Sequence, residues 1–405
     1  MERCVLAYSG GLDTTVIASI LQELGIEVVA LTLEIGQKED MREIAARAKS
    51  AGVKKIHAVN ALKEFVADYI FPAVQANCLY EGLYPEATAL GRPLIVKHLV
   101  EVARKEKCQA VAHGSTGKGN DQIRFENGVS ALAPELKVIA PVRDWELWRD
   151  EEVEYARERG IPVSTVSKKY SVDENIWGRS IEAGPVEKPE LEVPEDAFAW
   201  SVAPERAPDK PTYAKTFFEN GVPQSVEFSG GESGRVSGPV EIVEALNRVA
   251  GKNGVGRIDH MEDRVIGFKS REAYEAPAAL VLLPAHRELE KTVLTKDELE
   301  FKAGADHAFS ELVYRGQWWT PLRETLQELE ARLNEPVSGS ATVKLFKGSA
   351  RVVARESPNA LYSLALASYD KKATTWSQRE GAAFTKLFGL QNAMAWRLRK
   401  KGKKR

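Results

Sequence analysis

Apolar residues along the first 165 positions follow two alternating patterns. Short runs rich in valine, leucine and alanine are typical of buried strands, whereas apolar residues at every third or fourth position are typical of amphipathic helices. Strands are predicted over 4–8, 27–33, 54–59, 109–113 and 136–141, and the clearest helices over 14–24 and 40–52. This alternation predicts an α/β fold with an open, Rossmann-like parallel sheet and helices on both faces.

The pattern changes in the second half of the chain. Residues 184–235 are rich in Pro, Glu, Gly and Ser, which is typical of long connections or a protruding lobe. Beyond them we expect a helix over 241–251, strands over 264–270 and 279–283, and a hairpin over 341–355. Mixed elements of this kind predict an α+β second domain.

A helix is predicted over 377–401, where Phe384, Leu387, Leu390 and Trp396 form an apolar stripe. The stripe could pack on the chain's own core or on another subunit, and the pattern favours neither. The last nine residues carry seven positive charges. A solvated end is the usual meaning of such a tail, and an anion-binding arm is the alternative.

Composition excludes several classes of protein. The chain has 405 residues, a formal net charge of −2 and 43% hydrophobic residues, so it has no overall bias toward nucleic acid or acidic membranes. Cys4, Cys78 and Cys108 form no CxxC pair and suggest reduced thiols. The longest apolar run, 276–285, contains two prolines and is too short for a membrane span. With no visible signal peptide, we expect a cytoplasmic chain that binds neither membranes nor nucleic acid.

The segment AYSGGLDTT, residues 7–15, joins the first predicted strand to the first helix. Unpaired amides at a helix N-terminus attract anions, and glycines let a phosphate approach them closely. The hydroxyls of Ser9, Thr14 and Thr15 add donors. A tight, capped turn is the alternative. The segment is neither a lysine-containing P-loop nor a G-x-G-x-x-G fingerprint, yet its composition suits a chain of phosphates.

A second dense segment, AHGSTGKGNDQIRFE, covers residues 112–126. It follows a predicted strand, has three glycines within six residues, and then presents Asn120, Asp121 and Arg124. Taken alone, it could be a flexible surface loop. Ligands of parallel sheets bind at the carboxyl ends of the strands, however, and both glycine-rich loops follow such ends.

The SGGLDT sequence between strand and helix resembles the PP-loop of ATP pyrophosphatases, which cleave ATP between its α and β phosphates. Over nearly the whole chain, further segments resemble the argininosuccinate synthase family. They are 34–40, 68–85, 89–95, 112–126, 170–182, 254–277 and 285–290. The resemblance implies that citrulline attacks ATP to form a citrullyl-adenylate with release of pyrophosphate, and that aspartate then displaces AMP to give argininosuccinate.

The same resemblance implies where each substrate binds. ATP, with Mg²⁺ on its phosphates, would contact Ala7, Tyr8, Ser9, Gly10, Gly11, Leu12, Asp13, Thr14, Thr15, Leu33 and Gly114. Citrulline would contact Tyr84, Ala89, Asn120, Arg124, Ser171, Ser180, Glu262 and Tyr274. Aspartate would contact Thr116, Asn120 and Asp121.

Charge suggests roles for three of these residues. Glu262 could accept hydrogen bonds from the ammonium of citrulline, and Arg124, with the serine hydroxyls, could bind its carboxylate. Asp121 could either hold the ammonium of aspartate or take its proton.

Three positions depart from the usual family pattern. Thr15 replaces a serine and keeps the hydroxyl, Leu33 replaces an alanine beside the adenine, and Ala89 stands where serine or threonine often contacts citrulline. We therefore expect no side-chain role for Ala89.

The resemblance also implies three domains. Residues 1–165 would form the PP-loop ATP-binding domain, 166–365 a synthetase domain for citrulline, aspartate and multimerisation, and 366–405 an oligomerisation helix with the basic tail. Family members of this type are homotetramers, with the C-terminal helix reaching across subunits.

Two other functions remain possible from the residues alone. A tRNA-thiolating PP-loop enzyme would need reactive cysteines and a basic surface, which this composition does not provide. A non-catalytic nucleotide-binding module, such as a stress-type sensor, would need only the first 165 residues. It would leave the polar segments 170–182 and 254–277 without a role.

Overall fold

The computed structural model describes residues 2–38, 40–161, 169–369 and 375–402. Residues 1–359 form one compact unit and residues 360–405 a second one. The predicted boundary at residue 165 falls outside the described residues, and the division into three domains stays a prediction.

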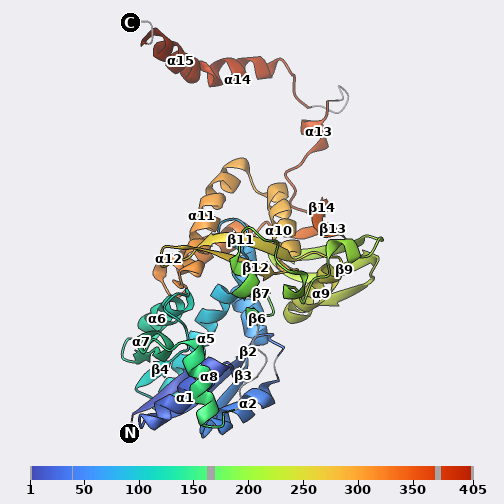
Figure 1. The fold of residues 1–405 in the computed structure, drawn as a ribbon. Helices are drawn as coiled ribbons and strands as arrows, with labels where there is room; N and C mark the ends of the chain where they lie inside the picture. The colour runs from blue at the N-terminus through green and yellow to red at the C-terminus, as the bar shows by residue number, and fades with distance from the viewer. Residues whose placement is uncertain (1, 39, 162–168, 370–374, 403–405) are drawn as a thin grey trace. The chain divides into compact units, whose positions relative to one another are not determined.

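A five-stranded parallel sheet with strand order β3-β2-β1-β4-β5 forms the N-terminal half of the larger unit (Figure 1). Its strands are β1 (Arg3–Ala7), β2 (Glu27–Glu34), β3 (Lys55–Asn60), β4 (Ala110–Ala112) and β5 (Lys137–Ile139). They match the five predicted strands and confirm the predicted α/β fold.

Helices cover both faces of this sheet because its central strands, β1, β2 and β4, are buried on both sides. Cys4 and Leu6 pack with helices α1 and α2, whereas Val5 belongs to the core on the opposite face, beside α5. The helices are α1 (Leu12–Glu23), α2 (Met41–Ser50), α3 (Leu62–Phe65), α4 (Phe71–Gln75), α5 (Ala87–Glu106), α6 (Asp121–Leu132), α7 (Pro141–Asp144) and α8 (Arg149–Glu158). A π-helical turn, η1 (Val66–Ile70), joins α3 to α4.

Two sheets form the rest of this unit. One has the order β11-β12-β7-β6 and is antiparallel, with β6 (Ser171–Asn175), β7 (Gly178–Glu182), β11 (Arg257–Asp263) and β12 (Lys269–Glu275). The other has the order β10-β9-β8-β13-β14, with β8 (Thr212–Glu219), β9 (Val222–Gly230), β10 (Gly234–Ser237), β13 (Gly339–Phe346) and β14 (Ser349–Glu356). Helices α9 (Pro239–Lys252), α10 (Ala279–Val293), α11 (Lys296–Tyr314) and α12 (Pro321–Asn334) pack with them. The α+β prediction and the predicted 341–355 hairpin are confirmed.

Two element predictions in this half were wrong. Residues 279–283 begin helix α10, because every side chain but one in this turn is buried and a fully buried helix resembles a strand in sequence. Residues 264–268 form a turn closed by Arg264 and Phe268, so β12 begins only at Lys269. The stretch 184–235, expected to hold long connections or a protruding lobe, contains strands β8 and β9 and the start of β10 as well as connections.

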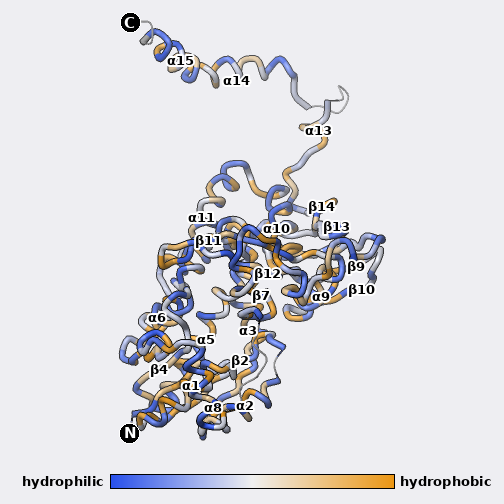
Figure 2. The backbone as a smooth tube through the Cα atoms, viewed as in Figure 1, coloured by the Kyte–Doolittle hydropathy of each residue, from blue (hydrophilic) through white to orange (hydrophobic). Residues whose placement is uncertain are grey.

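The C-terminal unit contains α13 (Leu364–Ala367), α14 (Glu380–Phe388) and α15 (Leu390–Gly402). The single helix predicted over 377–401 is therefore divided at Gly389. Hydrophobic and hydrophilic residues alternate along α14 and α15 (Figure 2). Within the described parts of the chain, no helix combines the length and apolar character that a membrane span requires.

Candidate active site

The first glycine-rich loop leaves the sheet after Ala7 and enters helix α1 at Leu12. Gly10 has a φ of +77°, and a Cβ added there would lie 3.0 Å from Cγ2 of Ile44. No side chain caps the N-terminus of α1. The hydroxyls form a local network, with 3.2 Å between those of Ser9 and Thr14. This arrangement leaves a glycine-lined helix N-terminus with hydroxyl donors beside it, as an anion-binding loop requires.

The second glycine-rich loop, residues 114–119, lies directly beside the first. Strands β1 and β4 are parallel neighbours, so the loops that follow them start at the same edge of the sheet. A Cβ added to Gly114 would lie 3.3 Å from Cγ2 of Thr14. Leu33 is buried at the carboxyl end of the adjacent strand β2. The structure therefore brings the predicted ATP contacts to one edge of the sheet.

Asp121, the first residue of α6, lies between two arginines. Its carboxylate accepts hydrogen bonds from Arg92 at 2.7 Å and from Arg124 at 2.9 Å. Burial alone would raise the pKa of Asp121, but the two guanidinium groups lower it to about 2. Asp121 is therefore ionised at neutral pH. An ionised carboxylate of such low pKa is suited to holding an ammonium group and is a poor base.

Glu262 is the centre of a buried tyrosine cluster. Its carboxylate, in a residue 3% exposed, accepts hydrogen bonds from the hydroxyls of Tyr274 and Tyr314, the latter at 2.7 Å. Tyr84 stacks on Tyr274 with ring centroids 4.1 Å apart, and burial raises the pKa of both phenols. Among the described residues, no cationic side chain forms an ion pair with Glu262. A buried carboxylate with donors but no cation can accept an ammonium group from a ligand.

The predicted hydroxyl contacts lie beside this cluster, with one exception. Ser180 pairs with Tyr274 across β7 and β12, and its hydroxyl lies 3.0 Å from that of Thr88 at the start of α5. The adjacent Ala89 is completely buried. Ser171 lies on the same sheet face as Ser180 but is exposed at the outer end of β6.

Asn120 connects the predicted aspartate and citrulline residues. Its amide nitrogen donates to the Tyr314 hydroxyl at 2.9 Å, and its carbonyl oxygen accepts from the Val265 amide at 3.0 Å. Arg124 donates from Nε to the Tyr314 carbonyl at 3.0 Å. Thr116, by contrast, is exposed on the second glycine-rich loop.

Sequence reasoning gave no role to three residues of this cluster. Arg92 joins Asp121 to Asp173, Tyr314 joins Asn120 to Glu262, and Arg264 contacts the second glycine-rich loop. Arg92 and Arg264 lie in segments that resemble the family, 89–95 and 254–277, but nothing in those segments pointed to their contacts with Asp121 and with the second glycine-rich loop. Tyr314 lies outside every segment that carried the resemblance.

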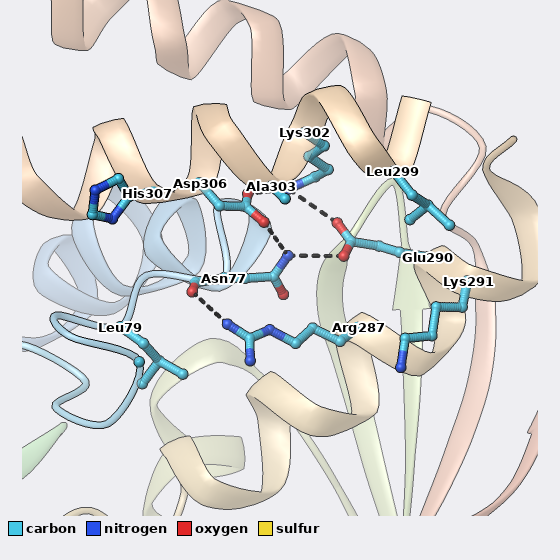
Figure 3. A pocket seen from close by; sticks show the side chains of 11 residues that line it. Asn77, Leu79, Arg287, Glu290, Lys291, Leu299, Lys302, Ala303, Asp306 and His307 are labelled. Atoms are coloured by element: carbon cyan, nitrogen blue, oxygen red, sulfur yellow. Dashed lines mark hydrogen bonds and ion pairs between the residues drawn. The ribbon is translucent and has the colours of Figure 1, made fainter. Parts of the chain in front are cut away.

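A separate pocket of about 390 Å³ lies between α10, α11 and the turn after α4 (Figure 3). In it, Lys302 forms ion pairs with Glu290 at 3.1 Å and with Asp306 at 2.5 Å, and Asn77 donates to both carboxylates. None of the predicted substrate residues lines this pocket. Its buried charges are paired with one another, which indicates a structural role.

The first glycine-rich loop contains no lysine and lies at the carboxyl edge of a parallel sheet, next to the polar cluster around Glu262 and Asp121. Together these features define an ATP-using enzyme with a PP-loop type of nucleotide-binding domain. The family model for the Arginosuccinate synthase N-terminal HUP domain matches residues 3–162, and that for the C-terminal domain matches residues 170–395. The chain belongs to the argininosuccinate synthase family.

Similarity to individual relatives extends over the whole chain. It is 51% identical to the argininosuccinate synthase of Pyrococcus furiosus, over 98% of this chain and 95% of the relative. It is 50% identical to that of Rubrobacter xylanophilus, over 96% and 94%, and 50% identical to that of Methanocaldococcus jannaschii, over the full length of both. The resemblance inferred from the sequence is thereby confirmed, and both alternative functions are set aside.

Proposed function

We propose that this chain converts citrulline to citrullyl-adenylate with ATP and then joins it to aspartate, releasing AMP. The observation that carries the proposal is Glu262, a buried carboxylate with two phenol donors and no cationic partner among the described residues. It gives the site a specific place for the ammonium of an amino acid.

Citrulline fits between Glu262 and the hydroxyls of Thr88 and Ser180. Its ammonium would pair with Glu262, and its carboxylate would be bound by the Ser180 hydroxyl together with Arg124. The stacked rings of Tyr84 and Tyr274 form a wall beside it. Because the protein would bind the ammonium and the carboxylate of citrulline at separate points, only one orientation of the substrate fits. In this orientation the ureido group faces the nucleotide.

ATP fits on the first glycine-rich loop, with its outer phosphates at the N-terminus of α1. Backbone amides and the hydroxyls of Ser9, Thr14 and Thr15 would stabilise the pyrophosphate as it leaves. The ureido oxygen attacks the α-phosphate, and the bond between this phosphate and the pyrophosphate breaks. The ureido oxygen is then bonded to AMP, which is a better leaving group than the oxygen of free citrulline. Mg²⁺, which prefers oxygen ligands, would neutralise charge on these phosphates when bound.

Aspartate fits beside the second glycine-rich loop, at Thr116, Asn120 and Asp121. The low pKa of Asp121 favours the first of its two predicted roles, in which the ionised carboxylate holds and orients the ammonium of aspartate. Once this ammonium has released a proton to solvent, the free amine attacks the activated carbon of citrulline, the bond from that carbon to the AMP oxygen breaks, and AMP leaves.

We also propose a cytoplasmic homotetramer in which the C-terminal helices pack on neighbouring subunits. Phe384, Leu387 and Trp396 are 64%, 68% and 62% exposed, which supports burial against another copy. The three cysteines are free and buried, as suits a reducing compartment.

The test measures the two half-reactions separately. We expect exchange of labelled pyrophosphate into ATP only when citrulline is present, and argininosuccinate with AMP only when aspartate is added. Glu262→Gln should raise the KM for citrulline, whereas Glu356→Gln, at an exposed ion pair with Lys215, should change neither step. Exchange without citrulline, or ADP as a product, contradicts the proposal.

A further inference from the structure

The turn between β11 and β12, residues 264–268, contacts the second glycine-rich loop from the opposite half of the compact unit. Arg264 donates from Nη1 to the carbonyl of Lys118 at 3.1 Å. The amide of Val265 donates to the side chain of Asn120 at 3.0 Å. Two successive residues of one turn therefore hold two positions in the segment that carries the proposed aspartate contacts.

Arg264 is itself held firmly. Its Nη2 donates to Glu182 at 2.8 Å and to Glu272 at 2.5 Å, and its Nε donates to the hydroxyl of Ser270 at 2.9 Å. The side chain is only 15% exposed. Because a guanidinium group has a fixed planar set of donors, these partners determine where the remaining donor points.

The other hydrogen bonds of this loop are local, to His113 just before it, to Gln122 at the start of α6 and within the loop itself. Thr116, Gly117 and Lys118 are exposed, and the loop's internal bonds include a long one, 3.3 Å, from Gly119 to the Thr116 carbonyl. Gln122 holds Gly117 from the start of α6 at 2.6 Å. Glycines leave a backbone with many conformations, so each anchoring contact removes a substantial share of that freedom.

We propose that Arg264 is a positioning residue that holds the loop 114–119 in the conformation that binds aspartate. The inference rests on the proposed function, because it assigns aspartate to Thr116, Asn120 and Asp121. Arg264 lies two residues after Glu262 on the same hairpin, so the element that receives citrulline also fixes the aspartate loop. Loss of this contact impairs aspartate binding and leaves citrulline activation intact.

Arg264→Lys is the main test, since it keeps the positive charge but cannot reach all four partners at once. We expect the KM for aspartate to rise about tenfold, which corresponds to about 1.4 kcal/mol, with kcat and citrulline-dependent pyrophosphate exchange changed less than about threefold. Hydrogen–deuterium exchange of the amides in 114–119 should become faster in the same variant. A general loss of stability would instead make exchange faster in other parts of the chain as well.

Arg271→Lys is the matched control. Arg271 lies on the same hairpin, donates to Asp259 at 2.8 Å and 2.6 Å, and contacts backbone carbonyls of Val186 and Lys188, but it does not touch the loop. We expect its aspartate KM and the loop's exchange rates to match those of the unaltered enzyme.

Glu182→Gln is a second variant in case Arg264→Lys does not fold. Glu182 is 45% exposed, so the change is tolerable, and it releases one ion pair of Arg264. A smaller rise in aspartate KM is expected. The inference is overturned if foldable variants leave aspartate KM and loop protection unchanged, or if both half-reactions weaken equally. Failure of the proposed function would show differently, as absence of citrulline-dependent exchange in the unaltered enzyme.

Discussion

Asp121→Asn separates the two half-reactions, because Asp121 belongs to the proposed aspartate contacts and not to the proposed ATP or citrulline contacts. The change keeps the shape of the side chain and removes its charge. Arg92 retains Asp173 as a partner, whereas Arg124 loses its carboxylate partner. Asparagine can still accept a hydrogen bond but no longer attracts an ammonium group strongly.

The structure gives the size of this effect. The pKa of Asp121 falls from 3.8 to about 2 in the folded chain, a difference of about 1.8 units, and at 1.36 kcal/mol per unit this is about 2 kcal/mol. Because the folded pKa is lowered, this stabilisation is present above pH 3.8 and is lost as the pH falls toward 2. Asp121→Asn should therefore lower the free energy of unfolding by about 2 kcal/mol at pH 7. The difference from the unaltered chain should shrink in acid.

Activity should fall selectively. A hydrogen bond to a charged group contributes about 1.5–3 kcal/mol, so kcat/KM for aspartate should fall roughly 10- to 100-fold. Citrulline-dependent pyrophosphate exchange should stay within about threefold, a change under 1 kcal/mol. Asp259→Asn, which removes an ion pair with Arg271 on the same hairpin, is the control and should affect neither step. Equal loss of both half-reactions would refute the role of Asp121.

Three further predictions follow from the structure. Gly10→Ala should cost about 1–2 kcal/mol of backbone strain in addition to crowding Ile44, and should raise the KM for ATP. Gly25, with a φ of +80° and open space around it, is the control: Gly25→Ala should reduce stability and leave the KM for ATP unchanged. An unchanged KM for ATP in Gly10→Ala would contradict ATP binding at the first glycine-rich loop. Burial raises the pKa of Glu86 to about 8, so the folded chain holds this proton more tightly than the unfolded chain and should lose stability as the pH rises from about 4.5 to 8. Glu86→Gln has no proton to lose there, so its free energy of unfolding, from denaturant titrations, should fall less over this range. Parallel pH profiles of the two proteins would contradict this. A chain ending before Ser377 should have a smaller mass by light scattering than the full chain, and an identical assembly state would rule out an assembly role for the C-terminal helices.

The fold of the N-terminal half was predictable because its central strands, β1, β2 and β4, are buried on both faces. Cys4, Val5 and Leu6 are all completely buried, so this strand reads as a continuous apolar run in the sequence. Such runs, repeated between helical patterns, are typical of a parallel sheet covered on both faces. The same logic failed at 279–283, where burial on all sides of the first turns of α10 also produced a continuous run. The spacing of apolar residues shows which side chains are buried, and it distinguishes a helix from a strand only where one side of the element faces water.

The glycine-rich loops were predictable for a different reason, since each is a contiguous segment whose chemistry is visible in a few residues. The contacts of Tyr314 were not. It reaches Asn120 across 194 positions in the chain and Glu262 across 52, and no local pattern distinguishes a tyrosine that does so from a core aromatic. Glu262 itself was found only through family resemblance.

The residues that sequence reasoning missed have one property in common: they connect groups from distant parts of the chain. Tyr314 connects Asn120 to Glu262, and Arg264 connects the hairpin that carries Glu262 to Lys118 in the second glycine-rich loop. Because Asn120 accepts from the turn that carries Arg264 and donates to Tyr314, which in turn donates to Glu262, an unbroken chain of hydrogen bonds joins the proposed citrulline site to the segment that carries the proposed aspartate contacts.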